Sequence, residues 1–160
     1  MSSADLMNTS PVELCDEEET RELEELLVNQ IYRLNAQITG YFDARLLGGR
    51  VRGPSGETLA AFSGHTWGGC CVVSNLWVDD ARRRQGLGRS LLEAVEAEAV
   101  HRGCAQIVLS THSFQAPAFY ERMGYLKLAV IFDLPKGYAD IVFVKRFTLS
   151  GDASVAGLST

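Results

Sequence analysis

The chain contains 160 residues, of which 46% are hydrophobic and 22% are charged, and its formal net charge is −5. This composition is typical of a single soluble globular domain, and the acidic balance argues against nucleic acid or an anionic membrane surface as a partner. The apolar runs are too short to span a membrane, and the polar segment MSSADLMNTS lacks the basic and apolar regions of a signal peptide, so we expect a cytoplasmic protein.

Residues 1–10 and 150–160 are predicted to be flexible tails, which leaves 11–149 as one domain. The domain begins with an amphipathic helix predicted over 16–35, where Asp16 and Glu19 are spaced as a capping box. The apolar residues of this segment recur at spacings of three and four, as on one face of a helix. They are Leu23, Leu26, Leu27, Ile31 and Leu34.

Strands are predicted next over 44–52 and 58–67, joined by the turn GPSG, and a third strand over 70–78. A helix then begins in the glycine-containing loop and ends near Gly103. Its expected buried residues are Leu87, Leu91, Leu92 and Val95.

The run QIVLS at 106–110 has the continuous apolar centre IVL, as expected for a short strand covered on both faces. A short helix over 116–122 and strands over 125–132 and 140–148 complete the domain. Because the strand, helix and strand from 70 to 110 imply a parallel crossover, the predicted class is α/β (α+β) with a mixed central sheet flanked by helices.

The four cysteines are predicted to be reduced structural thiols, with no metal site. No two of them have CxxC spacing, and the neighbours Cys70 and Cys71 would point to opposite faces of a strand.

The loop RRRQGLGRS, residues 82–90, joins the third strand to the following helix. Free N–H groups and the helix dipole attract anions at a helix N-terminus, and Gly86 and Gly88 let the main chain turn tightly and approach a ligand. The arginines add full positive charges, so the loop suits a diphosphate. The alternative is a plain helix start with solvated arginines. A dinucleotide fingerprint is excluded because Leu91 stands where its third glycine belongs, and no P-loop Gly-Lys-Ser/Thr is present.

Two blocks of the sequence, LWVDDARRRQGLGRSLLEAVEAEA and FQAPAFYERMGY, together resemble the GNAT superfamily of acetyl-CoA-dependent N-acetyltransferases. The family signature Arg/Gln-x-x-Gly-x-Gly/Ala corresponds to Arg83, Gly86 and Gly88, and the second block is similar to the family's Phe-Tyr-Glu motif. The resemblance covers about residues 40–148 and implies the GNAT fold, in which the strands corresponding to 70–78 and 106–110 splay apart.

The resemblance also implies where acetyl-CoA binds. The main-chain N–H groups of the loop would hold the pyrophosphate, with two arginine side chains nearby. The pantetheine arm would pair with the strand that contains Leu76 and Val78, and an N–H of that segment would stabilise the oxyanion. Ser113 stands where many members have asparagine, so contacts on that side depart from the family pattern. The loop residues concerned are Arg83, Arg84, Gln85, Gly86, Leu87, Gly88 and Arg89.

For the chemistry, no cysteine with a neighbouring base is recognisable, which favours direct attack of the amine in a ternary complex. Tyr120, the tyrosine of the Phe-Tyr-Glu motif, is the predicted general acid, and the alternative is a packed tyrosine whose hydroxyl bonds to the backbone. His112 is a candidate general base, with a surface or core histidine as the alternative. Water could also serve, and the poorer candidates are Asp79, Glu121 and His65.

The acceptor is predicted to be a primary amine, and the acids of segment 16–25 suggest a cationic one. That segment is otherwise a solvated helix face. Trp67 and Trp77 could line an acceptor pocket or pack in the core. Many members of the superfamily form dimers, so a homodimer is compatible with the resemblance. The alternative function is a non-catalytic acyl-CoA-binding regulatory module.

Overall fold

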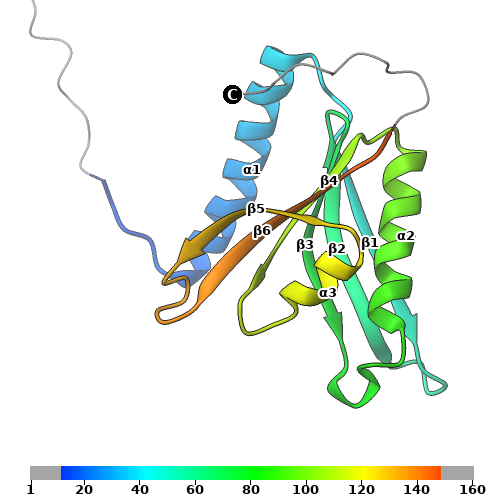
Figure 1. Cartoon of the computed structure of the whole chain (residues 1–160). Helices are drawn as coiled ribbons and strands as arrows, with labels where there is room; N and C mark the ends of the chain where they lie inside the picture. The colour runs from blue at the N-terminus through cyan, green and yellow to red at the C-terminus, as the bar shows by residue number, and fades with distance from the viewer. Residues whose placement is uncertain (1–11, 149–160) are drawn as a thin grey trace, which may run out of the picture. The chain divides into compact units, whose positions relative to one another are not determined.

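The computed structural model describes residues 12–148, so the two predicted tails, 1–10 and 150–160, lie outside the described residues. The chain forms two compact units, one up to Tyr41 and one from Phe42 onward (Figure 1). The prediction of one domain over 11–149 stays a prediction. No helix in the described range is long and apolar enough to span a membrane.

The first unit consists of helix α1 (Glu17–Thr39). Its N-terminus has the predicted capping box, because the Asp16 carboxylate accepts from the Glu18 and Glu19 N–H groups while the Glu19 side chain accepts from the Asp16 N–H. Gly40 ends the helix in the left-handed conformation, with φ of 76°. The helix is therefore confirmed and extends four residues beyond the predicted end.

The second unit is built on a six-stranded mixed sheet in the order β1-β2-β3-β4-β6-β5. Every neighbouring pair is antiparallel except β3 and β4, which are parallel as predicted. The strands are β1 (Arg45–Arg52), β2 (Thr58–Trp67), β3 (Cys70–Val78), β4 (Gln106–His112), β5 (Leu126–Phe132) and β6 (Ala139–Arg146). All six lie within two residues of their predicted bounds, and β2 and β3 match them at both ends.

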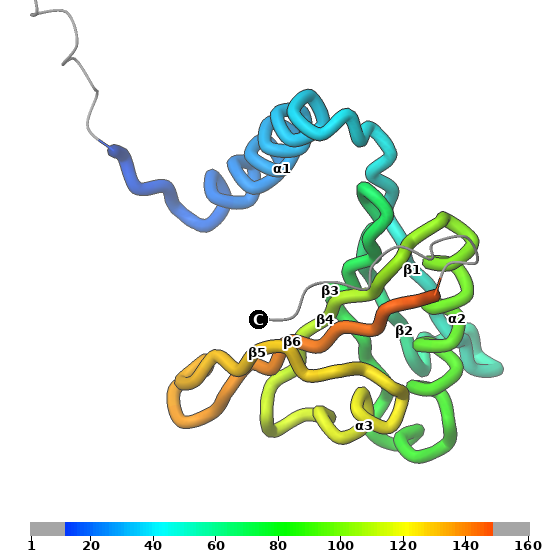
Figure 2. The backbone as a smooth tube through the Cα atoms, turned by 45° about the horizontal axis from the view of Figure 1, so that its top comes forward, coloured from blue at the N-terminus to red at the C-terminus, as the bar shows by residue number. Residues whose placement is uncertain are grey.

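The parallel strands β3 and β4 pair over only four residues. Their last matched pair is Val73 with Leu109, although β3 continues to Val78 and β4 to His112. At the same point the register of β3 against β2 shifts, so that Ser74 is an extra residue in a bulge. Because a bulge bends its strand, it turns the remainder of β3 away from β4. The predicted splay is thus present, and Figure 2 shows the two strands in the sheet.

Helix α2 (Leu87–His101) packs across β1 to β4 and contributes the largest share of helical residues to the core. Its fully or nearly fully buried residues are Leu91, Leu92, Val95 and Ala99, whereas Leu87 is partly buried at the edge of the core. Gly103, with φ of 76°, follows the helix, and the Cys104 N–H donates to the Ala99 carbonyl. This bond closes a Schellman motif, which confirms the predicted helix end.

Two features differ from expectation. A short 3-10 helix, η1 (Asp80–Arg82), precedes α2 and was not predicted. In β4, Ile107, Leu109 and Thr111 are buried but Ser110 is exposed, so the second unit by itself covers one face of this strand rather than both. The alternation is the pattern of a half-buried strand, which the run of three apolar residues at 107–109 conceals.

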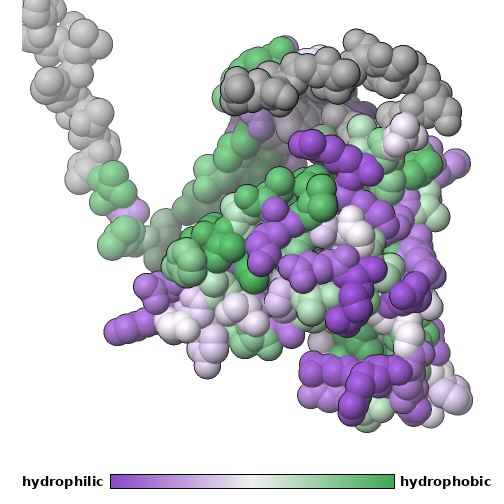
Figure 3. Space-filling view, in the orientation of Figure 1, coloured by the Kyte–Doolittle hydropathy of each residue, from purple (hydrophilic) through white to green (hydrophobic). Residues whose placement is uncertain are grey.

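Helix α3 (Pro117–Arg122) contacts β5 and completes the second unit. All seven residues of the edge strand β5 are exposed, and apolar side chains gather over this part of the surface (Figure 3). The loop between β3 and α2 is covered instead by polar and charged side chains (Figure 3).

Candidate functional site

The loop between β3 and α2 folds into two tight turns. The Asp79 carboxylate accepts from the Ala81 N–H, which starts η1, and the Gln85 amide donates back to the Ala81 carbonyl. Arg84 and Gly86 then take left-handed conformations, with φ of 62° and 85°. Only glycine adopts such a φ without cost, so Gly86 matches the backbone that leads into α2.

The main-chain N–H groups of residues 84–89 have no acceptor within the described residues. The bonds that form around them come from earlier or later positions, such as Arg83 N–H to Asp80 O and Ser90 N–H to Gly86 O. A Cβ built on Gly86 meets no atom within 4 Å, so the space in front of these donors is open. An open row of donors at the positive end of a helix dipole fits a diphosphate.

The arginines of the loop are exposed rather than fixed. Arg83 pairs with Asp80 at 2.6 Å and Arg89 with Glu93 at 3.7 Å, and in each pair both side chains are more than half exposed. Pairs of this kind contribute little to stability. No ion pair among the described residues involves Arg84, so its charge is available to an anion at the loop.

Gly88, predicted to let the main chain approach a ligand, also lies close to two other elements. It lies in the first turn of α2, and a Cβ there would lie 3.6 Å from Phe119 Cζ and 3.7 Å from Val78 Cγ2. Both distances are ordinary van der Waals contacts, so a methyl group would fit at Gly88 and a larger side chain would press against Phe119 and Val78. Since Tyr120 follows Phe119, this contact also ties the general-acid candidate to the loop.

Tyr120 packs its ring in the core and leaves its hydroxyl unbonded. The ring lies against Phe119, Tyr125 and Phe143, with centroids at 5.1, 6.0 and 5.8 Å, and the residue is 7% exposed. No hydrogen bond joins the hydroxyl to any described residue, so the alternative of a backbone-bonded hydroxyl is not what the structure has. Burial raises the pKa of the Tyr120 phenol above its ordinary value, which keeps the proton on oxygen at neutral pH.

His112 is the last residue of β4, at the open end of the splay. Its Nδ1 lies 3.5 Å from Oδ1 of Asp140, which faces it across the β4–β6 ladder. Its ring stacks on Phe114 with centroids 5.2 Å apart, and Phe114 meets Tyr138 edge-on at 4.8 Å. Sequence reasoning missed Asp140, because only the pairing of β4 with β6 reveals it.

Ser113 has partners within the chain. Its hydroxyl accepts from the Ala139 N–H at 3.1 Å, and its own N–H donates to the Ala139 carbonyl at 2.7 Å. These bonds extend the β4–β6 ladder by one residue, so the Ser113 side chain has a structural role whether or not it also contacts the pantetheine arm.

The free edge of β3 is the other half of the candidate site. Beyond Val73 the strand pairs with β2 on one side and with no strand on the other. Leu76 and Val78 are half-buried within this stretch, and Trp77 between them is 47% exposed, so Trp77 is not a core residue. The main-chain groups on the open side can pair with an extended ligand, as the predicted pantetheine contact requires.

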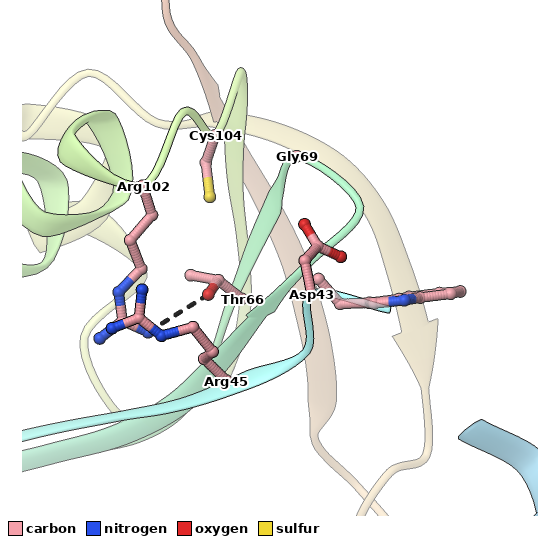
Figure 4. A pocket seen from close by; sticks show the side chains of 7 residues that line it. Asp43, Arg45, Thr66, Gly69, Arg102 and Cys104 are labelled. Atoms are coloured by element: carbon pink, nitrogen blue, oxygen red, sulfur yellow. Dashed lines mark hydrogen bonds between the residues drawn. The ribbon is translucent and has the colours of Figure 1, made fainter. Parts of the chain in front are cut away.

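One cavity lies at the far end of α2 from this site, and a second borders the loop at Ser90 and Leu91. One of about 100 Å³ is formed by the ends of β2 and α2, where Arg102 donates to the Thr66 hydroxyl and Cys104 and Asp43 line the wall (Figure 4). The other, about 510 Å³, is a groove between β1 and α2. Because α2 spans about 22 Å, its C-terminal end cannot be part of a site at its N-terminus.

The cysteines are free thiols, as predicted, and Cys70 and Cys71 do point to opposite faces of β3. Cys71 and Cys104 are buried and Cys70 is half-buried, whereas Cys15 is exposed and therefore has no packing role in the described residues. Within residues 12–148 no group of three His, Cys, Asp or Glu side chains could hold a metal ion. Burial raises the pKa of the Cys71 thiol to about 11, so this thiol is not activated.

Comparison with known proteins identifies one family. The model described as the acetyltransferase (GNAT) family matches residues 8–125, a range that contains the loop, His112 and Tyr120. Blasticidin-S acetyltransferase of Streptomyces morookaense is 39% identical over 95 residues, which cover 59% of this chain and 70% of the relative. An acetyltransferase of Agrobacterium fabrum is 31% identical over 126 residues, which cover 79% of this chain and 92% of the relative.

A solved structure agrees in fold. The crystal structure of an acetyltransferase from Bacillus cereus matches with a TM-score of 0.73 at 29% sequence identity. The match covers 86% of this chain and 98% of the other. The overall fold is thus shared over nearly the whole of that protein.

Proposed function

The chain belongs to the GNAT family of acetyltransferases, and from this premise we propose that it transfers an acetyl group from acetyl-CoA to a primary amine by direct attack. The observation that carries the proposal is the open row of main-chain N–H groups at residues 84–89, which fits the pyrophosphate of coenzyme A. The co-substrate supplies the acetyl group as a thioester.

The residues of this chain supply three functions in the reaction. The loop and Arg84 bind the pyrophosphate, and the free edge of β3 holds the pantetheine arm and directs an N–H of the Leu76 to Val78 segment at the carbonyl oxygen. Such a donor contributes on the order of 3 kcal/mol to transition-state stabilisation. Reaction forms one C–N bond and breaks one C–S bond.

The protons move through two side chains. The leaving thiolate takes its proton from the Tyr120 hydroxyl, which is protonated at neutral pH because the ordinary pKa of a phenol is 10.0 and burial raises it further. The attacking amine loses its proton to His112 at the end of β4 or to water at the open end of the splay. The absence of an activated thiol among the described cysteines is consistent with a ternary complex rather than a covalent route.

The acceptor we propose is a small cationic molecule. One relative is an acetyltransferase of blasticidin-S, and the first turn of α1 carries Glu17, Glu18 and Glu19 next to further acids of segment 16–25. A chain with a net charge of −5 attracts cationic molecules more strongly than anionic ones. We place the protein in the cytoplasm and leave open whether it forms a homodimer.

A panel of amines tests the proposal directly. Release of free coenzyme A thiol is measured with acetyl-CoA and each amine in turn, and with the Tyr120→Phe protein as the control. We expect thiol release with at least one cationic amine. This release should require the amine and should also require the tyrosine. Tight coenzyme A binding with no turnover on any amine would instead support the alternative, a non-catalytic acyl-CoA-binding module.

A further inference from the structure

His112 and Asp140 form a polar pair at the end of the splay where the acceptor must approach. The β4–β6 ladder matches the two residues directly, and His112 Nδ1 lies 3.5 Å from Asp140 Oδ1. The Asp140 side chain is 14% exposed and that of His112 is 36% exposed, so the carboxylate is the inner partner and the imidazole the outer one.

The buried nitrogen of the imidazole needs a partner that only Asp140 can provide. Nδ1 is enclosed and has no hydrogen bond of good geometry. A buried donor without a partner is unfavourable, whereas a proton on Nδ1 faces a carboxylate oxygen only slightly beyond hydrogen-bond distance. The pairing therefore favours the tautomer with the proton on Nδ1, which leaves the lone pair on Nε2.

Other contacts hold the ring in this orientation. Phe114 stacks on the imidazole at an interplanar angle of 25°, and Tyr138 supports Phe114 from the β5–β6 turn. The His112 N–H donates to the Gln115 side chain at 3.0 Å, which fixes the backbone. Within residues 12–148, Asp140 is the only charged side chain at ion-pair distance from the imidazole. The titratable side chain of Tyr138 on the turn contacts Phe114.

We propose that Asp140 is a positioning residue for His112, and that the pair is the general base for the amine acceptor. The inference rests on the proposed acetyl transfer and extends it to a residue for which the sequence carries no signal. Asp140 holds the proton on Nδ1 and stabilises the imidazolium that forms, as a buried carboxylate does for a catalytic imidazole.

The proton balance is complete with these groups. As the amine nitrogen bonds to the acetyl carbon it becomes positively charged, and it gives one proton to Nε2 of His112. The resulting imidazolium carries protons on both nitrogens, with Nδ1–H directed at the Asp140 carboxylate. After the amide leaves, the proton on Nε2 passes to water and the pair returns to its starting state, while Tyr120 takes up a proton from water to replace the one that it gave to the thiolate.

The test combines kinetics with a spectroscopic readout. In the Asp140→Ala protein we expect kcat to fall roughly tenfold or more while KM for acetyl-CoA stays unchanged. In the His112→Ala background the same substitution should change kcat less than twofold, because the partner through which it acts is gone. Asp133→Asn, which removes one negative charge from the same β5–β6 hairpin, is the matched control and should keep wild-type kcat.

Nitrogen-15 NMR of the imidazole measures the tautomer without any substrate. We expect the proton of wild-type His112 on Nδ1 at a pH where the ring is neutral, and on Nε2 in Asp140→Ala. A wild-type proton on Nε2 would overturn the inference, and so would an equal kcat loss from Asp140→Ala in the wild-type and His112→Ala backgrounds. If the Asp140→Ala protein does not fold, the wild-type spectrum still decides. An inactive wild-type protein with the Nδ1 tautomer would refute the proposed function and leave the pairing standing.

Discussion

Phe119 Cζ lies 3.6 Å from the point where a side chain on Gly88 would begin. This contact connects the first turn of α2, which begins at the loop, with α3, which carries Tyr120. The binding loop and the proposed acid thus belong to elements that come close to each other at Gly88 and Phe119. A shift of α3 against α2 changes the distance between them.

Replacing Gly88 is expected to disturb both stability and catalysis, and the effect should grow with the size of the new side chain. Gly88→Ala places a Cβ at ordinary contact distance, so kcat should change little. Gly88→Val adds two methyl groups against Phe119 and Val78, and overpacking of this kind costs about 1–3 kcal/mol in the free energy of unfolding. Urea unfolding and kcat of both proteins check this, and a fully active, equally stable Gly88→Val would contradict the packing role.

Gly86→Val should abolish tight coenzyme A binding while the fold survives. A β-branched residue at φ of 85° is strained by about 1–2 kcal/mol, and its side chain would occupy the open space in front of the loop donors. Gly56→Val is a matched control, because Gly56 has φ of 84° and equally open surroundings but lies in the turn between β1 and β2. Calorimetry should show lost affinity only for Gly86→Val, and equal affinities in the two variants would refute the loop assignment.

Tyr120→Phe should lower kcat by about 10²- to 10⁴-fold with little change in KM, since the proton is donated only in the transition state. The hydroxyl makes no hydrogen bond to the described residues, so the free energy of unfolding should change by less than about 1 kcal/mol. Because burial raises the pKa of the phenol, the loss of wild-type kcat at high pH should begin above the ordinary value of 10.0. A destabilised but fully active variant would assign Tyr120 to packing alone.

Stability should fall at alkaline pH in part because of Cys71. Burial raises the pKa of this thiol from 9.0 to about 11, so the folded protein keeps a proton that the unfolded chain releases. The contribution is therefore fully present below pH 9 and is lost as pH rises toward 11, with a slope of about 1.4 kcal/mol per pH unit. Urea titrations of Cys71→Ala between pH 8 and pH 11 should show a shallower decline than wild type, and identical slopes would contradict it.

Neutralising Glu22, Glu24 and Glu25 together should raise KM for a cationic acceptor and leave KM for acetyl-CoA unchanged. All three side chains are exposed on α1 and form no ion pair with any described residue, so removing their charge should not unfold the helix. The effect should weaken in high salt, because screening reduces long-range attraction. An unchanged KM, or an anionic preferred acceptor, would show that these acids only solvate the helix.

Local sequence determined most of the elements of this protein, because each depends on neighbours in the chain. The capping box of Asp16 and Glu19 and the Schellman end at Gly103 are formed by residues within a few positions of one another. The loop around Gly86 could also be predicted. Glycine is the residue best suited to the positive φ at this helix start, and the blocks LWVDDARRRQGLGRSLLEAVEAEA and FQAPAFYERMGY resemble one family.

Only the tertiary structure decided which distant residues meet. Gly88 packs against Phe119 across 31 positions of sequence, and His112 meets Asp140 because β4 pairs with β6 in one of several registers that alternation alone allows. The half-buried pattern of β4 and the unbonded hydroxyl of Tyr120 likewise depend on what neighbouring elements supply. Pairing register and side-chain packing are sums over long-range contacts, and no short stretch of residues contains the information that sets them.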